Sequence, residues 1–141
     1  MQLKVFCDGG ARGNPGPAAI GFVVQDSTGS VIHQHGEFIG STTNNVAEYR
    51  AVIAALEWLI KNKSTFHFEL LTLNFYLDSA LVVNQLNGLF KIKQAHLREL
   101  VLQVKILESS LQVSPVYAAI PRSQNSHADS LVNQALDQQL Q

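Results

Sequence analysis

The sequence lacks several features that would each define a functional class. It contains a single cysteine, Cys7, which excludes a disulfide framework and a zinc site built from cysteines. No apolar run reaches the roughly 18 residues of a membrane-spanning helix. The first residues, MQLKV, do not form the apolar core of a signal peptide. We therefore expect a cytoplasmic protein that does not associate with membranes.

Net charge is also nearly absent. Ten Lys and Arg stand against eleven Asp and Glu, which gives −1, and only 15% of the residues are charged. Such a chain has no overall field to attract nucleic acid or an anionic membrane. Because 46% of its 141 residues are hydrophobic, the chain can bury a core, and disorder is excluded. We predict a single domain over residues 1–141.

The hydrophobic pattern predicts an α/β fold. Apolar residues first alternate as in strands and are separated by glycine- and proline-rich turns, which indicates an antiparallel meander. They then recur every three or four residues from Val46 to Ile60, which indicates a helix with Thr43 or Asn44 as its N-cap. The predicted strands are 3–7, 19–25, 31–38, 71–78 and 113–120, and the predicted helices are 46–60, 79–86, 94–108 and 125–140. Because the last two strands are each reached through a helical crossover, the five-stranded sheet must be mixed and flanked by helices.

Four of the eleven carboxylates have unusual positions. Asp8 and Asp78 each end a predicted strand. Glu48 lies one turn into the first long helix, and Asp129 lies in the first turn of the last helix. Ligand sites of α/β sheets gather at strand ends, beside loops and helix starts. Carboxylates brought together there repel one another and stay ionised only when cations neutralise them.

Oxygen ligands without cysteine favour Mg²⁺ or Mn²⁺ over zinc. Two such ions about 4 Å apart suit the hydrolysis of a phosphodiester. Each acid alone also has an ordinary explanation. Asp8 could form a turn, Asp78 could cap the following helix, Asp129 could favour a helix N-terminus, and Glu48 could be a solvated helical residue. The sequence around the acids decides between these interpretations.

Each acid lies in a distinctive segment. The segments are 8–18 (DGGARGNPGPA), 42–51 (TTNNVAEYRA), 76–88 (YLDSALVVNQLNG) and 125–131 (NSHADSL). In this order and over nearly the whole chain, they resemble the four motifs of type 1 ribonuclease H. The first two are quite specific, whereas the last two would be weak alone. The resemblance is closest to the compact archaeal and bacterial branch of that family.

The resemblance implies a ribonuclease H-like fold and an endonuclease that cuts the RNA strand of RNA–DNA hybrids. It implies two Mg²⁺ or Mn²⁺ ions, in-line attack by a metal-activated water, and 5′-phosphate and 3′-hydroxyl ends. The catalytic and metal-binding residues would be Asp8, Glu48, Asp78 and Asp129. The substrate-binding residues would be Gly9, Gly10, Asn14, Thr43, Asn44 and Asn45. Gly9 and Gly10 would let a nucleic-acid strand approach the protein backbone closely, because they have no side chain. The side chains of the other four residues could form hydrogen bonds with 2′-hydroxyls. Asn44 and Asn45 could also serve as helix caps.

Two features depart from the family pattern. Many members carry a long loop with a histidine before the last acid, but the segment 121–126 is too short for it. His127 is the nearest histidine and could assist the reaction or face solvent. No basic protrusion is visible, although Arg12 and Arg122 could flank the site, so we expect modest, salt-sensitive binding to the hybrid. Nothing indicates a protein partner, and a monomer would suffice.

Three other functions compete with this interpretation. A nuclease or transposase could share the fold, but such proteins generally need additional DNA-binding domains, for which this chain is short. A binding module without catalysis would gain from neutral or basic residues where the four acids stand. A detached ribonuclease H domain of a reverse transcriptase is less consistent with a chain that starts at Met1.

Overall fold

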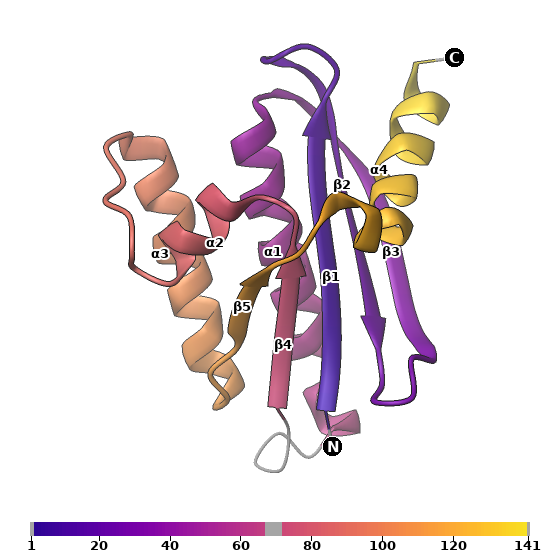
Figure 1. The fold of residues 1–141 in the computed structure, drawn as a ribbon, viewed down its shortest axis with the longest axis vertical. Coiled ribbons are helices and arrows are strands. Elements are labelled where there is room, and N and C mark those ends of the chain that lie inside the picture. Colours follow the sequence, from indigo (N-terminus) through magenta and orange to yellow (C-terminus); the bar gives the residue numbers. More distant parts are fainter. Residues whose placement is uncertain (1, 67–71, 141) are drawn as a thin grey trace.

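A mixed β-sheet forms the centre of the protein, as seen in a computed structural model that describes residues 2–66 and 72–140 (Figure 1). The strands in these ranges are β1 (Gln2–Ala11), β2 (Gly16–Gln25), β3 (Val31–Thr42), β4 (Thr72–Leu77) and β5 (Val116–Ala119). They lie in the order β3-β2-β1-β4-β5. The first three are antiparallel, and β4 is parallel to both β1 and β5. The predicted fold is confirmed, including the two strands that are reached by helical crossovers.

Helices cover both faces of this sheet. The helices are α1 (Asn44–Lys61), α2 (Ala80–Leu86), α3 (Ala95–Leu111) and α4 (Ser126–Gln139), with short 3₁₀ turns at Lys63–Thr65 and Arg122–Gln124. Alternate residues of β2 belong to different cores. Ile20 and Phe22 join the main core with α1, whereas Val23 packs with Ala128 and Leu131 of α4. Since neighbouring side chains of a strand point to opposite faces, α1 and α4 lie on opposite sides of the sheet. None of the helices within the described ranges is both long and apolar enough to span a bilayer.

The strand ends differ from the prediction. β1 continues to Ala11, so Asp8 lies inside the strand and not after it. The prediction ended the strand early because glycine has a low strand propensity, but Gly9 and Gly10 remain paired with β2. Cross-strand hydrogen bonds therefore outweigh the local preference. β5 is shorter than predicted and begins after Pro115, and the predicted start of the fourth strand, at 71, falls outside the described residues.

Side-chain caps fix where two of the helices begin. The hydroxyl of Thr43 accepts a hydrogen bond from the Val46 N–H at 3.3 Å, which confirms Thr43 as the N-cap of α1. Ser79 accepts a hydrogen bond from the Val82 N–H at 3.2 Å and caps α2. Asp78 is therefore not the cap of that helix, and its carboxylate remains available for another role.

Candidate active site

The parallel pairing of β1 and β4 sets Asp8 beside Asp78. The last paired residues are Phe6 and Tyr76, whose rings stack with centroids 5.1 Å apart. Asp8 and Asp78 each follow two residues later, so their side chains return to the face that carries these rings. Two carboxylates that are 70 positions apart in sequence thus become neighbours across the sheet.

Glu48 reaches the same place because Gly9 has no side chain. A Cβ atom at Gly9 would lie 2.2 Å from the carbonyl carbon of Ala47 and 2.5 Å from the backbone nitrogen of Glu48. The first turns of α1 therefore rest directly on the backbone of β1. We had expected glycine here to admit a nucleic-acid strand, but the close approach that requires it is made by α1. Its consequence is that Glu48 stands next to Asp8.

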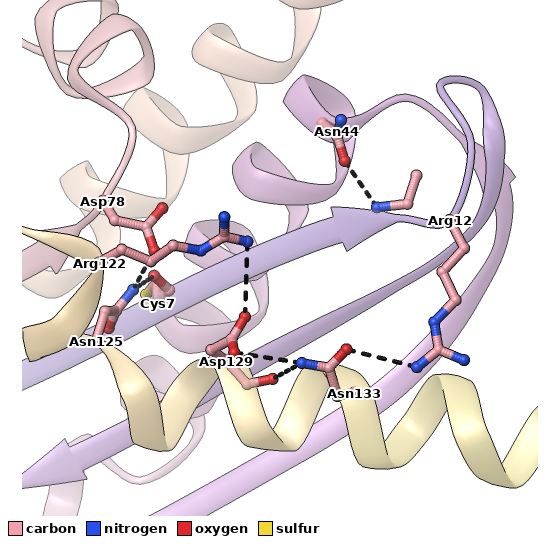
Figure 2. A network of polar contacts seen from close by, with 9 residues as sticks. Cys7, Arg12, Asn44, Asp78, Arg122, Asn125, Asp129 and Asn133 are labelled. Atoms are coloured by element: carbon pink, nitrogen blue, oxygen red, sulfur yellow. Dashed lines mark hydrogen bonds and ion pairs between the residues drawn. The ribbon is translucent and has the colours of Figure 1, made fainter.

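Asp129 is positioned by the way α4 packs on the sheet. A Cβ atom at Gly21 of β2 would lie only 2.6 Å from the carbonyl oxygen of Ala128, so glycine lets the first turn of α4 approach β2. Just before this helix, the buried Asn125 donates from Nδ2 to the Cys7 carbonyl at 2.9 Å and to Asp78 Oδ2 at 3.4 Å (Figure 2). Asn125 opens the segment 125–131, but it was not among the predicted site residues. An asparagine at a helix start is usually a cap, so the sequence carried no signal for this bridge.

All four predicted carboxylates line one pocket of about 430 Å³. We refer to it as the carboxylate pocket. Its lining comprises Asp8, Gly9, Gly10, Ala11, Arg12, Asn44, Glu48, Asp78, Arg122, Asp129, Val132, Asn133 and Leu136. The structure therefore brings together the four acids of β1, α1, α4 and the end of β4 that the sequence had singled out. It also places both expected flanking arginines in the lining.

The carboxylate pocket disfavours negative charge. Burial raises the pKa of Asp8 to about 8, with further increases from the charge of Asp78, a hydrogen bond to Asp129, and the charges of Asp129 and Glu48. Burial and the charge of Asp78 also raise the pKa of Glu48 to about 8, against the opposing effects of Arg122 and of a hydrogen bond from Ser79. Two of the four acids are thus held protonated near neutral pH unless a cation replaces the protons.

The donor set fits hard divalent cations. Every titratable ligand candidate in the carboxylate pocket is a carboxylate, and oxygen ligands of this kind suit Mg²⁺ and Mn²⁺. Within residues 2–66 and 72–140, no three His, Cys, Asp or Glu side chains are already arranged to hold an ion. The four acids therefore line a shared pocket, but they do not form a preassembled metal-coordination site.

The predicted substrate-binding residues fall into two neighbouring groups. Asn44 lines the carboxylate pocket with the two glycines, and its Oδ1 accepts a hydrogen bond from the Ala11 N–H at 2.8 Å (Figure 2). The Oδ1 of Asn14 accepts a hydrogen bond from the Asn44 N–H at 2.9 Å, which ties the β1–β2 loop to the start of α1. Asn14, Thr43 and Asn45 line an adjacent pocket with Gln94, His96 and Leu97.

His127 is not brought into the carboxylate pocket. Its Nε2 makes a 2.7 Å hydrogen bond with Gln34 on β3, and it is absent from the residues that line the pocket. The reason is helical geometry, because a residue two positions before Asp129 lies about 200° around the helix from it. The structure therefore gives no support to the assisting role that we considered for His127.

The chain resembles known proteins both in sequence and in fold. A family model described as reverse transcriptase-like matches residues 6–135. A solved structure of LC11-RNase H1, isolated from compost, shares 40% sequence identity with this chain, and the match covers 99% of both chains with a TM-score of 0.92. The chain belongs to the type 1 ribonuclease H family. A second structure of LC11-RNase H1 contains an RNA/DNA hybrid, and this type 1 ribonuclease H matches with a TM-score of 0.90.

Other members of the type 1 ribonuclease H family give the same result. RNase H1 from Halobacterium salinarum is 36% identical and covers 98% of this chain and 99% of its own, with a TM-score of 0.86. A bifunctional protein of Mycobacterium tuberculosis is 41% identical over 138 residues. This alignment covers 97% of the chain but only 36% of the mycobacterial protein. The chain thus spans about a third of the length of the curated mycobacterial relatives that it matches.

Proposed function

We propose that this protein hydrolyses the RNA strand of RNA–DNA hybrids, using two Mg²⁺ or Mn²⁺ ions and leaving 5′-phosphate and 3′-hydroxyl ends. The observation that carries the proposal is the convergence of Asp8, Glu48, Asp78 and Asp129 on one pocket. The structure of LC11-RNase H1 with an RNA/DNA hybrid supports the choice of substrate, because that protein is 40% identical and has the same fold.

The four carboxylates would hold the ions, and Asn125 and Ser79 would keep two of them in place. Asn125 donates to Asp78, and Ser79 donates to Glu48, so neither acid can rotate freely away from the pocket. Bound ions of this kind supply an activated water and stabilise the leaving oxygen. Arg122 lies 4.0 Å from Asp129 with its side chain 83% exposed, and can meet a phosphate at the pocket entrance.

Recognition of RNA requires contacts to the 2′-hydroxyl. The Nδ2 group of Asn44 donates to no protein acceptor in the described part of the chain, while the Oδ1 of the same amide is fixed by Ala11. Because Asn44 lines the carboxylate pocket, this donor could serve a substrate bound there. Asn14, Thr43 and Asn45, in the adjacent pocket, would continue this polar surface along the hybrid.

The proposal is tested by hydrolysis of a labelled RNA–DNA hybrid with Mg²⁺ or Mn²⁺. Asp8→Asn keeps the shape of the side chain but removes a charged ligand. We expect the cleavage rate to fall at least about a hundredfold, because metal stabilisation of the transition state contributes several kcal/mol. Glu57→Gln is the matched control, since Glu57 is an exposed acid of α1 outside the carboxylate pocket, and it should cut like the wild type.

Analysis of the product ends separates the proposed mechanism from other ribonuclease chemistry. Direct attack by water on the phosphate leaves the 2′-hydroxyl unreacted, so the new 3′ end should carry a free hydroxyl. A 2′,3′-cyclic phosphate, or equal cutting by the wild type and Asp8→Asn, would contradict the proposal.

A further inference from the structure

Arg12 lies at one end of a continuous run of polar contacts along α4 (Figure 2). One guanidinium nitrogen of Arg12 lies 2.6 Å from Asp137 Oδ1 and 3.5 Å from Asn133 Oδ1. The Nδ2 of Asn133 in turn donates to the Asp129 carbonyl at 3.1 Å and to Asp129 Oδ2 at 3.3 Å. Asn133 thus separates the Arg12 guanidinium from Asp129, a predicted metal ligand, and its neutral amide attracts the arginine less than a carboxylate at this position would.

The spacing along α4 places Arg12 within reach of a bound nucleic acid. Asp129, Asn133 and Asp137 are four residues apart, so they share one face of the helix at intervals of about 6 Å. Arg12 therefore lies about 6–12 Å along the helix from Asp129, which corresponds to about two to four base-pair steps of a duplex. Arg12, Asn133 and Asp129 all line the carboxylate pocket, so a strand bound over Asp129 could also contact Arg12.

The ion pair that holds Arg12 is exposed to solvent. The Arg12 side chain is 42% exposed, and that of Asp137 is 63% exposed. Exposed ion pairs contribute little to stability and are screened by salt, so the guanidinium can exchange one anion for another at small cost. A phosphate is a suitable replacement, because arginine can donate two parallel hydrogen bonds to it.

We propose that Asp137 stands in for a backbone phosphate: Arg12 rests on Asp137 in the free protein and transfers to a phosphate of the hybrid, near the cleaved bond, when substrate binds. This inference rests on the proposed function. Asp137 then competes with the substrate for Arg12 and lowers affinity. It also keeps the guanidinium away from Asp129 while the pocket has no substrate.

Two substitutions break the same ion pair and should have opposite effects on KM. With Arg12→Ala we expect KM for the hybrid to rise about 3- to 10-fold, kcat to stay within about twofold, and the slope of log affinity against log salt to become shallower by about one. With Asp137→Asn we expect KM to fall about two- to threefold, because Arg12 no longer has a competing anion. A purely structural role of the ion pair would move KM in the same direction in both variants.

The double variant and two charge-matched controls complete the experiment. In the Arg12→Ala background, Asp137→Asn should leave KM unchanged, because its effect depends on the arginine. Arg12→Lys should recover part of the affinity as a simple point charge. Arg50→Ala and Glu57→Gln remove equivalent charges from α1, outside the carboxylate pocket, and should behave like the wild type.

The outcomes separate this inference from the proposed function. A wild-type protein that cuts no hybrid would overturn both. A wild-type protein that cuts hybrids, with Arg12→Ala indistinguishable from Arg50→Ala, would overturn only the role of Arg12. A rise in KM on Asp137→Asn, or an Asp137→Asn effect that persists without the arginine, would show that Asp137 positions Arg12 and does not compete for it.

Discussion

Asn125 shows how much of the site depends on a single neutral side chain. Its amide joins β1, through the Cys7 carbonyl, to Asp78 and to the start of α4. It is completely enclosed, and its Oδ1 has no hydrogen-bond partner among the described residues. Burying a polar atom without a hydrogen-bond partner lowers the stability of the folded protein. The position of Asn125 beside the acids indicates that its role is to fix the geometry of the site.

Removing this amide should reduce both stability and activity. Asn125→Ala leaves the Cys7 carbonyl without its donor and frees Asp78, so we expect unfolding free energy to fall by about 1–3 kcal/mol. Cleavage should slow about 10- to 100-fold, as is usual when a group that orients metal ligands is lost. Urea unfolding and hybrid cleavage measure the two effects. Wild-type cleavage by a folded Asn125→Ala would show that the amide only stabilises the fold.

Arg122 should set the pH at which the pocket accepts metal. The pKa of Glu48 is raised to about 8, and Arg122 is one of the groups that oppose this rise. Because a carboxyl group must lose its proton to bind an ion, Mn²⁺ affinity should increase as pH rises toward 8. With Arg122→Ala, the pKa of Glu48 should rise further, and the increase should move to higher pH. Calorimetric titration of Mn²⁺ from pH 6 to 9 measures both curves, and affinity that does not vary over this range would contradict the assignment.

At the scale of secondary structure, local patterns predicted the helices better than the strand ends. The spacing from Val46 to Ile60 and the cap at Thr43 were sufficient for α1, because helical contacts are local in sequence. The ends of β1 depend on residues of β2, which no local pattern contains. For the same reason Asp8 was predicted as the end of a strand, although its role in the site was predicted from the motif around it.

The packing of α1 against β1 gives a sharp test at Gly9. A methyl group there would overlap the backbone of Ala47, so Gly9→Ala must push α1 away and carry Glu48 with it. We expect a loss of about 1–3 kcal/mol in unfolding free energy, together with a large loss of cleavage. Gly10→Ala is the matched control for stability, because its Cβ would meet only Val132 at 3.8 Å. Equal stability of the two variants in urea would contradict this view of the packing.

At the scale of the whole molecule, the acids should make the metal-free protein less stable as pH rises. Asp8 and Glu48 have pKa values of about 8 when folded and of about 4 when unfolded, so between these values the folded protein holds more protons. Unfolding free energy should therefore decrease as pH rises from about 4 to 8. Mg²⁺ should reverse this loss at pH 8 and have little effect at pH 5. Thermal unfolding with EDTA or Mg²⁺ tests this, and a metal-free protein that becomes more stable over this range would contradict it.

Most residues that line the carboxylate pocket could be predicted from the sequence, but the hydrogen bonds and ion pairs between them could not. The four acids stand in recognisable motifs, so their types and positions could be read from sequence. The bridge from Asn125, the contact of Ser79 with Glu48 and the partner of Arg12 depend on the distance between elements. The orientation of His127 was left open for a related reason, since the side of α4 that faces the pocket is set by packing on β2 and β3.

The parallel pairing of β1 with β4 also has a consequence during protein synthesis. β1 can pair with β4 only after about seventy further residues have been translated. Asp129, the last of the four acids, is translated still later. A ribosome-bound fragment that lacks this acid cannot complete the charge set. The carboxylate pocket can therefore form completely only after Asp129 has been translated and α4 has packed on the sheet.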